Sequence, residues 1–172
     1  RQDSSFLYFF GINQPGMTGV IDIDSGEDYL FGDDVTMDDI IWMGPQPSVK
    51  DMAASVHVGH SAPTGELKKF IAEARRQNRP IHYLPPYRHD TMLCLEELLD
   101  IRVAELKKHV SLELIKAVVD LRSVKEPCEI EEIERACDIG YEMHTTAMRL
   151  CKPGVKEQYI AGVIDGIAAS YG

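Results

Sequence analysis

Short apolar runs separated by polar turns fill the first part of the chain, a pattern typical of strands joined by loops. The aromatic run at residues 6–10 predicts a strand that ends at Gly11. Residues 19–24 and 29–31 predict a hairpin, because the "DSGE" between them is rich in turn-forming residues. The alternation in "SVHVGH" and the apolar "PIHYLP" predict two more brief strands.

Helical patterns lie between these runs. A short helix is predicted from Thr36 to Met43, capped by Thr36 and stopped at Gly44 and Pro45. Three further helices are predicted: Ser48 to Ala54, Thr64 (as the cap) to the stop at Asn78 and Pro80, and His89 to Asp100. Because strands and helices alternate, we expect an α/β domain with a mixed sheet flanked by helices.

The pattern changes after about Leu121, where a long helix is predicted to begin with Pro127 at its first position. One face of it carries an apolar stripe, spaced by three and four residues: Ile130, Ile133, Cys137, Gly140, His144, Ala147 and Cys151. Gly154 ends this helix, and a second follows from Val155 with these residues on its buried side: Ile160, Val163, Ile164, Ile167 and Tyr171. We therefore expect a first domain at 1–122 and a helical hairpin at 123–172.

Composition narrows the class of protein. A chain of 172 residues with 44% hydrophobic residues has enough apolar surface for a core. The net charge of -10 disfavours a nucleic-acid partner, because phosphate binding needs clustered Lys and Arg. No apolar stretch approaches the ~20 residues of a membrane span, so no membrane partner is expected. The four cysteines form no CxxC pair, and we expect reduced thiols and a cytoplasmic location.

The residues alone predict neither a catalytic nor a metal site. His57 and His60 have a spacing compatible with a metal, but no third ligand is evident, and ordinary surface or packing histidines are favoured. "DIDSGED" departs from a calcium loop in its Gly position and lacks the downstream Glu, so a solvated turn is favoured. His144 lies on the apolar stripe, where a hydrogen-bonded core histidine is favoured over a ligand or base.

Three segments carry a resemblance to a known family: the opening run, "DDIIWMG", and "LRSVKEPCEIEEIERACDIGYEMHTTAMRLCKPG". The opening motif consists of Arg1, Gln2, Ser4, Phe6 and Tyr8, followed by Gly11 and Pro15. The third segment carries Arg122, Lys125, Glu129 and Ile130. Together they resemble aminopeptidase P, the Xaa-Pro aminopeptidases, of the creatinase and prolidase family. Ser5 departs from the Asp that is usual there.

The resemblance implies a creatinase-type N-terminal domain followed by the start of a "pita-bread" catalytic domain. It implies a longer parent, with about one strand and one helix in front and most of the catalytic domain behind. That parent would hydrolyse the bond between an N-terminal residue and proline, act on peptides with proline at the second position, and form a homo-oligomer. Its cofactor would be two divalent metals, commonly manganese, whose Asp, His and Glu ligands all lie beyond the point matched by Gly172.

The resemblance also singles out Trp42, the one Trp of the chain. In aminopeptidase P a Trp of the matching segment can approach the active site of a neighbouring subunit, so Trp42 is a substrate-access candidate. Two alternatives stay open. By its local sequence, a lone Trp beside Ile40 and Ile41 is more often a core residue, and some relatives use the same architecture as a binding module without catalysis. No catalytic residue and no metal ligand is assigned to these 172 residues.

Overall fold

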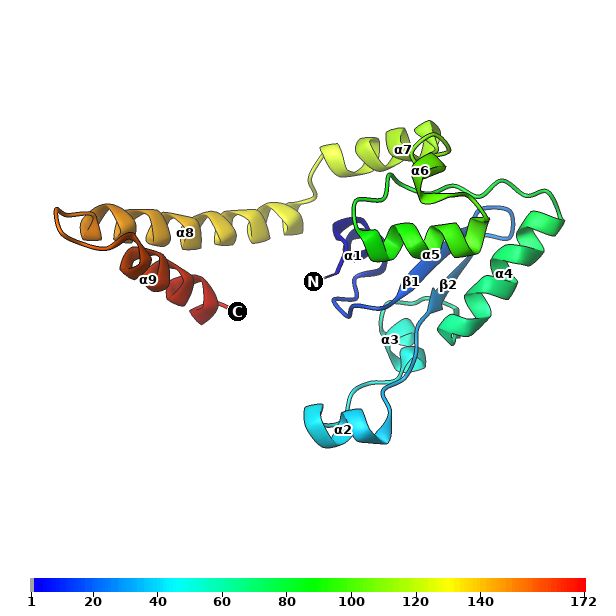
Figure 1. Ribbon diagram of the computed structural model, residues 1–172, viewed down its shortest axis with the longest axis horizontal. Coiled ribbons are helices and arrows are strands. Elements are labelled where there is room, and N and C mark those ends of the chain that lie inside the picture. The colour runs from blue at the N-terminus through cyan, green and yellow to red at the C-terminus, as the bar shows by residue number, and fades with distance from the viewer. Residues whose placement is uncertain (1) are drawn as a thin grey trace. The chain divides into compact units, whose positions relative to one another are not determined.

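A three-stranded mixed sheet organises the first part of the molecule (Figure 1). Strands β1 (Thr18–Asp22) and β2 (Glu27–Phe31) form an antiparallel hairpin, and β2 pairs in parallel with β3 (His60–Ala62). The computed structural model describes residues 2–172, in two compact units, Arg1–Ser111 and Leu112–Gly172. The predicted hairpin and the mixed sheet flanked by helices are thereby confirmed.

The opening aromatic run is a helix, and the strand predicted there is wrong. Helix α1 spans Ser4–Phe10, and the carboxylate of Asp3 accepts hydrogen bonds from the backbone N–H of Ser5 and Phe6, at 2.8 and 3.2 Å. The helix ends at Gly11 in the left-handed region, with φ 67°. Because capping at both ends favours the helix, it overrides the strand preference of the aromatic side chains.

Two other predicted strands need correction. The segment "SVHVGH" is helical at its start, since α3 runs over Val49–Ser55, and strand structure begins only at His60. Between residues 80 and 85 the structure assigns no strand. Pro80 and Pro85 have no N–H to donate to a sheet, yet Ile81 and Tyr83 still pack against the sheet's apolar cluster.

Strand β2 contributes to both apolar clusters of the first unit, because its consecutive side chains point to opposite faces of the sheet. Leu30 lies in one cluster, together with Ile12, Val49 and Ala53. Phe31 lies in the other, with Leu67 and Ile71 of α4 (Thr64–Arg76) and Leu99 of α5 (His89–Leu99). The helices predicted from Thr64 and from His89 are thus confirmed as α4 and α5. Helix α6 (Val103–Leu106) adds the fully buried Leu106.

The second unit consists of α7 (Leu112–Ser123), α8 (Pro127–Leu150) and α9 (Glu157–Ser170). Helix α8 starts with Pro127 in its first turn as predicted, and α9 turns back along it to make the predicted helical hairpin (Figure 1). His144 and Tyr171, predicted to be buried, are exposed. Their apolar neighbours on the hairpin are at most half-buried, because two helices alone cover little surface.

The domain boundary expected between residues 122 and 123 falls inside this second unit and stays a prediction. Across residues 2–172, no helix combines the length and the apolar character that crossing a membrane requires.

Candidate functional site

Trp42 lies on α2 (Met37–Met43), the helix predicted from the sequence. Thr36 caps it: the Thr36 hydroxyl accepts from the Asp39 N–H at 3.2 Å, and the Asp39 carboxylate accepts from the Thr36 N–H at 2.9 Å. This capping box satisfies two backbone donors of the first turn. Hydrogen bonds from the Thr36 side chain and backbone lower the pKa of Asp39. Gly44, at φ 76°, ends the helix as predicted.

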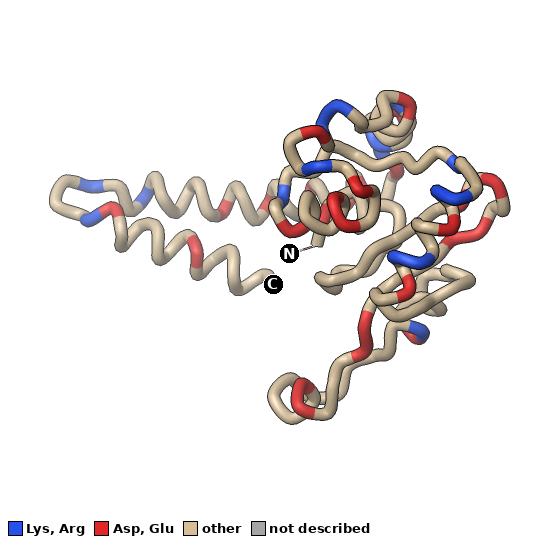
Figure 2. The backbone as a smooth tube through the Cα atoms, turned by 45° about the vertical axis from the view of Figure 1, so that its right-hand side comes forward, with Lys and Arg blue, Asp and Glu red and all other residues tan. Residues whose placement is uncertain are grey.

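The side chains of α2 are open to solvent. Trp42 is 88% exposed, Ile41 and Met37 are each 74% exposed, and no residue of α2 is buried. Figures 1 and 2, two views 45° apart, both show α2 projecting away from the sheet, and Figure 2 marks its acidic residues in red. The core alternative for Trp42 is therefore wrong. A cluster of large apolar side chains exposed in this way is typical of a contact surface.

The base of this projecting segment, in contrast to its tip, is well anchored. Gly32 donates its N–H to the Ala62 carbonyl at 3.1 Å, which extends the pairing of β2 with β3. A Cβ at Gly32 would lie 3.2 Å from Met17 and 3.3 Å from Val49, so the backbone packs tightly here. The Asp34 carboxylate accepts from the Val49 N–H at 2.6 Å. The segment that carries Trp42 thus begins and ends at fixed points of the first unit.

The histidine pair does not form a metal site. His60 approaches the Glu27 carboxylate at 3.1 Å and stacks on Tyr29, with ring centroids 4.7 Å apart. His57 adopts a positive φ of 61° in the turn after α3. Among residues 2–172, no three His, Cys, Asp or Glu side chains come close enough together to hold a metal ion. No metal site is therefore assigned to His57 and His60.

The acidic turn "DIDSGED" is held by Arg79. The Asp22 carboxylate accepts from the backbone N–H groups of Asp24 and Ser25, at 3.1 and 3.4 Å, and from the Arg79 guanidinium. The Arg79 hydrogen bond lowers the pKa of Asp22 to about 2. Arg79 also bonds the Asp24 carboxylate at 2.9 Å. Because these oxygens serve the turn and Arg79, the interpretation as a hairpin turn holds and the calcium loop does not.

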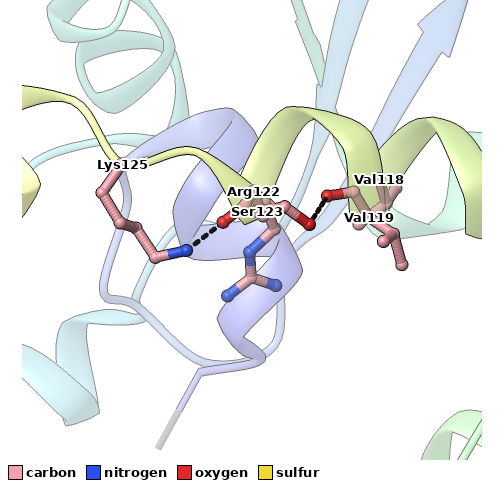
Figure 3. A pocket seen from close by; sticks show the side chains of 5 residues that line it. All are labelled: Val118, Val119, Arg122, Ser123 and Lys125. Atoms are coloured by element: carbon pink, nitrogen blue, oxygen red, sulfur yellow. Dashed lines mark hydrogen bonds between the residues drawn. The ribbon is translucent and has the colours of Figure 1, made fainter.

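A shallow hollow on the second unit lies at the C-terminal end of α7 (Figure 3). Its lining is as follows: Val118, Val119, Arg122, Ser123 and Lys125. The Ser123 hydroxyl donates to the Val119 carbonyl at 2.6 Å, and the Lys125 ammonium donates to the Arg122 carbonyl. This lining has no carboxylate, imidazole or thiol to bind a metal, and its one ammonium group, that of Lys125, is hydrogen-bonded to the Arg122 carbonyl.

The same region explains part of the family motif in physical terms. Lys125 binds a carbonyl of the last turn of α7, and the Glu129 carboxylate accepts from the Glu126 N–H at 2.9 Å at the start of α8. These side chains end one helix and begin the next. Two of the motif residues, Lys125 and Glu129, therefore help to fix a helix boundary here.

Sequence reasoning missed Asp33 and Asp34 as functional candidates. The Asp33 carboxylate accepts from the Thr64 N–H at 3.0 Å, so it, and not Thr64 itself, caps the start of α4. The partners of Asp33 and Asp34 lie 31 and 15 residues away along the chain. No local pattern signals caps at such separations, because cap motifs in sequence span only about three residues.

Comparison with known proteins gives similarities that agree with one another. Residues 1–83 match the family described as "Aminopeptidase P, N-terminal domain". A human Xaa-Pro dipeptidase is 27% identical over the whole chain, and a probable Xaa-Pro aminopeptidase pepP from Emericella nidulans is 25% identical over 93% of it. The chain spans 34% of the length of the human relative.

Solved structures of aminopeptidase P share the fold. Proline aminopeptidase P II from Yersinia pestis superimposes with a TM-score of 0.76 at 23% identity, over all of this chain and 41% of its own. Aminopeptidase P from E. coli gives a TM-score of 0.74 at 22% identity with the same coverage. Another of these structures is described as zinc-substituted E. coli aminopeptidase P in complex with product. The resemblance seen in the sequence is confirmed as a similarity: residues 1–83 match the aminopeptidase P N-terminal domain, the chain is similar along its whole length to a Xaa-Pro dipeptidase, and it shares its fold with aminopeptidase P.

Proposed function

We propose that this chain is the N-terminal part of a dinuclear-metal Xaa-Pro aminopeptidase, which hydrolyses the bond between an N-terminal residue and proline. The observation that carries the proposal is a match to aminopeptidase P structures along the whole chain, with relatives named for Xaa-Pro peptide cleavage. Its substrates are peptides with proline at the second position. We expect a cytoplasmic enzyme, a homo-oligomer, and manganese as the preferred metal.

Within that protein, these 172 residues serve substrate access and subunit contacts and do not carry out the chemistry. The described side chains offer no metal-ligand cluster, and we assign the ligands to the part of the protein that follows Gly172. The exposed Trp42 and Ile41 of α2 form the access surface, since they contribute nothing to the interior of the first unit. Large aromatic side chains of this kind are favoured anchors at contact surfaces.

A cleavage assay on the longer protein tests the proposal. The purified protein is stripped with a chelator, reloaded with Mn²⁺ or Zn²⁺, and given Ala-Pro-Ala and Ala-Pro in parallel. We expect metal-dependent release of Ala from the tripeptide. Cleavage confined to the dipeptide would replace the aminopeptidase assignment with a dipeptidase.

The same assay separates the enzyme from a binding module without catalysis. If the protein binds Ala-Pro-Ala but does not hydrolyse it with either metal, that result would favour the binding module and contradict the proposal. The 172-residue chain alone is the matched control, and we expect it to cleave neither peptide. Metal-dependent cleavage by this chain would contradict its assignment as an access region.

A further inference from the structure

Two consecutive aspartates, Asp33 and Asp34, follow β2 along the chain and bind the N-termini of two different helices. The Asp33 carboxylate accepts from the Thr64 N–H of α4 at 3.0 Å. The Asp34 carboxylate accepts from the Val49 N–H of α3 at 2.6 Å. The first N–H groups of a helix have no partner within the helix, and its N-terminus favours negative charge. Each carboxylate therefore meets a donor that the helix itself leaves open.

Neither helix supplies this partner from its own cap residue. The cap of α4 is Pro63, whose side chain makes no hydrogen bond to the helix. In α3 the Ser48 hydroxyl accepts from the Asp51 N–H at 3.1 Å, which leaves the Val49 N–H to Asp34. Asp33 and Asp34 thus accept hydrogen bonds from two helix N-terminal N–H groups that residues nearby in the sequence leave without a partner.

The position of these bonds relative to α2 gives them a further consequence. Asp34 lies just before α2 and Val49 lies after the return segment, so their hydrogen bond closes the loop that carries Trp42. Asp33, at the start of the same loop, is hydrogen-bonded to the first residue of α4. Inside the loop, α2 has its own capping box and buries no residue. The direction in which α2 projects is therefore determined at its base.

We propose that Asp33 and Asp34 are positioning residues that hold the Trp42 surface in a fixed direction. The inference rests on the access role proposed for Trp42, and it adds the residues through which the fold controls that role. Without the two caps, α2 keeps its helical structure but moves relative to the sheet. Trp42 then reaches its contact position only part of the time, and turnover falls without any change in the catalytic groups.

The fluorescence anisotropy decay of Trp42 tests the positioning directly, because the 172-residue chain contains one Trp. In Asp33→Ala/Asp34→Ala we expect a loss of residual anisotropy relative to wild type. Asp33→Asn/Asp34→Asn is the matched control, since the amide oxygen still accepts a hydrogen bond. We expect its residual anisotropy to be close to that of wild type. Asp120→Ala removes an exposed carboxylate elsewhere and leaves the decay unchanged. Equal decays in wild type and the double Ala variant would overturn the proposal.

Turnover of Ala-Pro-Ala by the longer protein tests the functional consequence. We expect Asp33→Ala/Asp34→Ala to lose part of the kcat/KM that Trp42→Ala loses, and the triple variant to lose no more than Trp42→Ala alone. Additive losses would overturn the link to Trp42. If Trp42→Ala leaves turnover unchanged, the access role itself fails, whereas the anisotropy result still decides the positioning.

Should the double Ala variant not fold, as judged by circular dichroism, amide hydrogen exchange of the wild-type chain decides the positioning. Protected N–H groups at Val49 and Thr64 support it, and rapid exchange at both overturns it.

Discussion

Strand β2 and helix α2 are neighbours along the chain, and both carry large apolar side chains, but they use them in opposite ways. In β2, Leu30 is 0% exposed and Phe31 is 2% exposed. In α2, Ile41 is 74% exposed and Trp42 is 88% exposed. The apolar residues of β2 hold the first unit together, whereas those of α2 are dispensable for it. Large apolar side chains that are exposed and not part of the core are typical of a surface that contacts another molecule. The contrast in exposure between β2 and α2 therefore supports the contact role of α2.

The largest effect is expected in β2. Leu30→Ala empties a fully buried site between β2 and α3, and we expect a loss of about 2–5 kcal/mol in the free energy of unfolding. Ile41→Ala on α2 is the matched control, with an expected change of about 0.5 kcal/mol or less. Urea unfolding followed by circular dichroism measures both. Similar losses in the two variants would remove the contrast between the regions.

A smaller effect is expected at the start of α1, which is held by its cap. Asp3 accepts from the N–H groups of Ser5 and Phe6 and from the Tyr87 hydroxyl at 2.8 Å. Burial alone would raise the pKa of Asp3, but hydrogen bonds from Tyr87, Phe6 and Ser5 lower it. We expect Asp3→Ala to cost about 1 kcal/mol and Asp3→Asn to cost less, in the same unfolding measurement. If Asp3→Ala left the free energy of unfolding unchanged, the cap at Asp3 would not be what stabilises α1.

A pH-dependent effect is expected at the β1–β2 turn. Arg79 lowers the pKa of Asp22 from 3.8 to about 2. A lowered pKa in the folded state contributes stability that is fully present above pH 3.8 and is lost as the pH falls toward 2. We therefore expect the melting temperature of wild type to fall over this range by more than that of Arg79→Ala. Parallel curves for the two proteins would contradict the role assigned to Arg79.

The sequence predicted those elements whose signals are local. The hairpin around "DSGE", the capped helix at Thr36 and the helix starting at Pro127 each have turn or cap residues beside them, and all three are confirmed. The aromatic residues of the run 6–10 suit a strand, but Asp3, three positions before Phe6, supplies a helix cap that overrides this preference. Residues 80–85 look like a strand in isolation, but strand formation depends on a neighbour that the pattern cannot supply.

The candidate site was harder to predict for the same reason. The resemblance pointed to Trp42, but its exposure follows from how far α2 stands from the sheet, which no local pattern encodes. The caps from Asp33 and Asp34 join residues 31 and 15 positions apart and depend on the finished fold.

Replacement of Trp42 in the longer protein tests the central claim most directly. Trp42→Ala is compared with wild type for kcat/KM on Ala-Pro-Ala, with Trp42→Phe as the conservative control. The account predicts an unfolding free energy within about 0.5 kcal/mol of wild type, because Trp42 is 88% exposed, together with a clear loss of turnover that Phe partly restores. Unchanged turnover would contradict the access role. So would a loss of about 3–5 kcal/mol in stability, which is the value for an emptied core site.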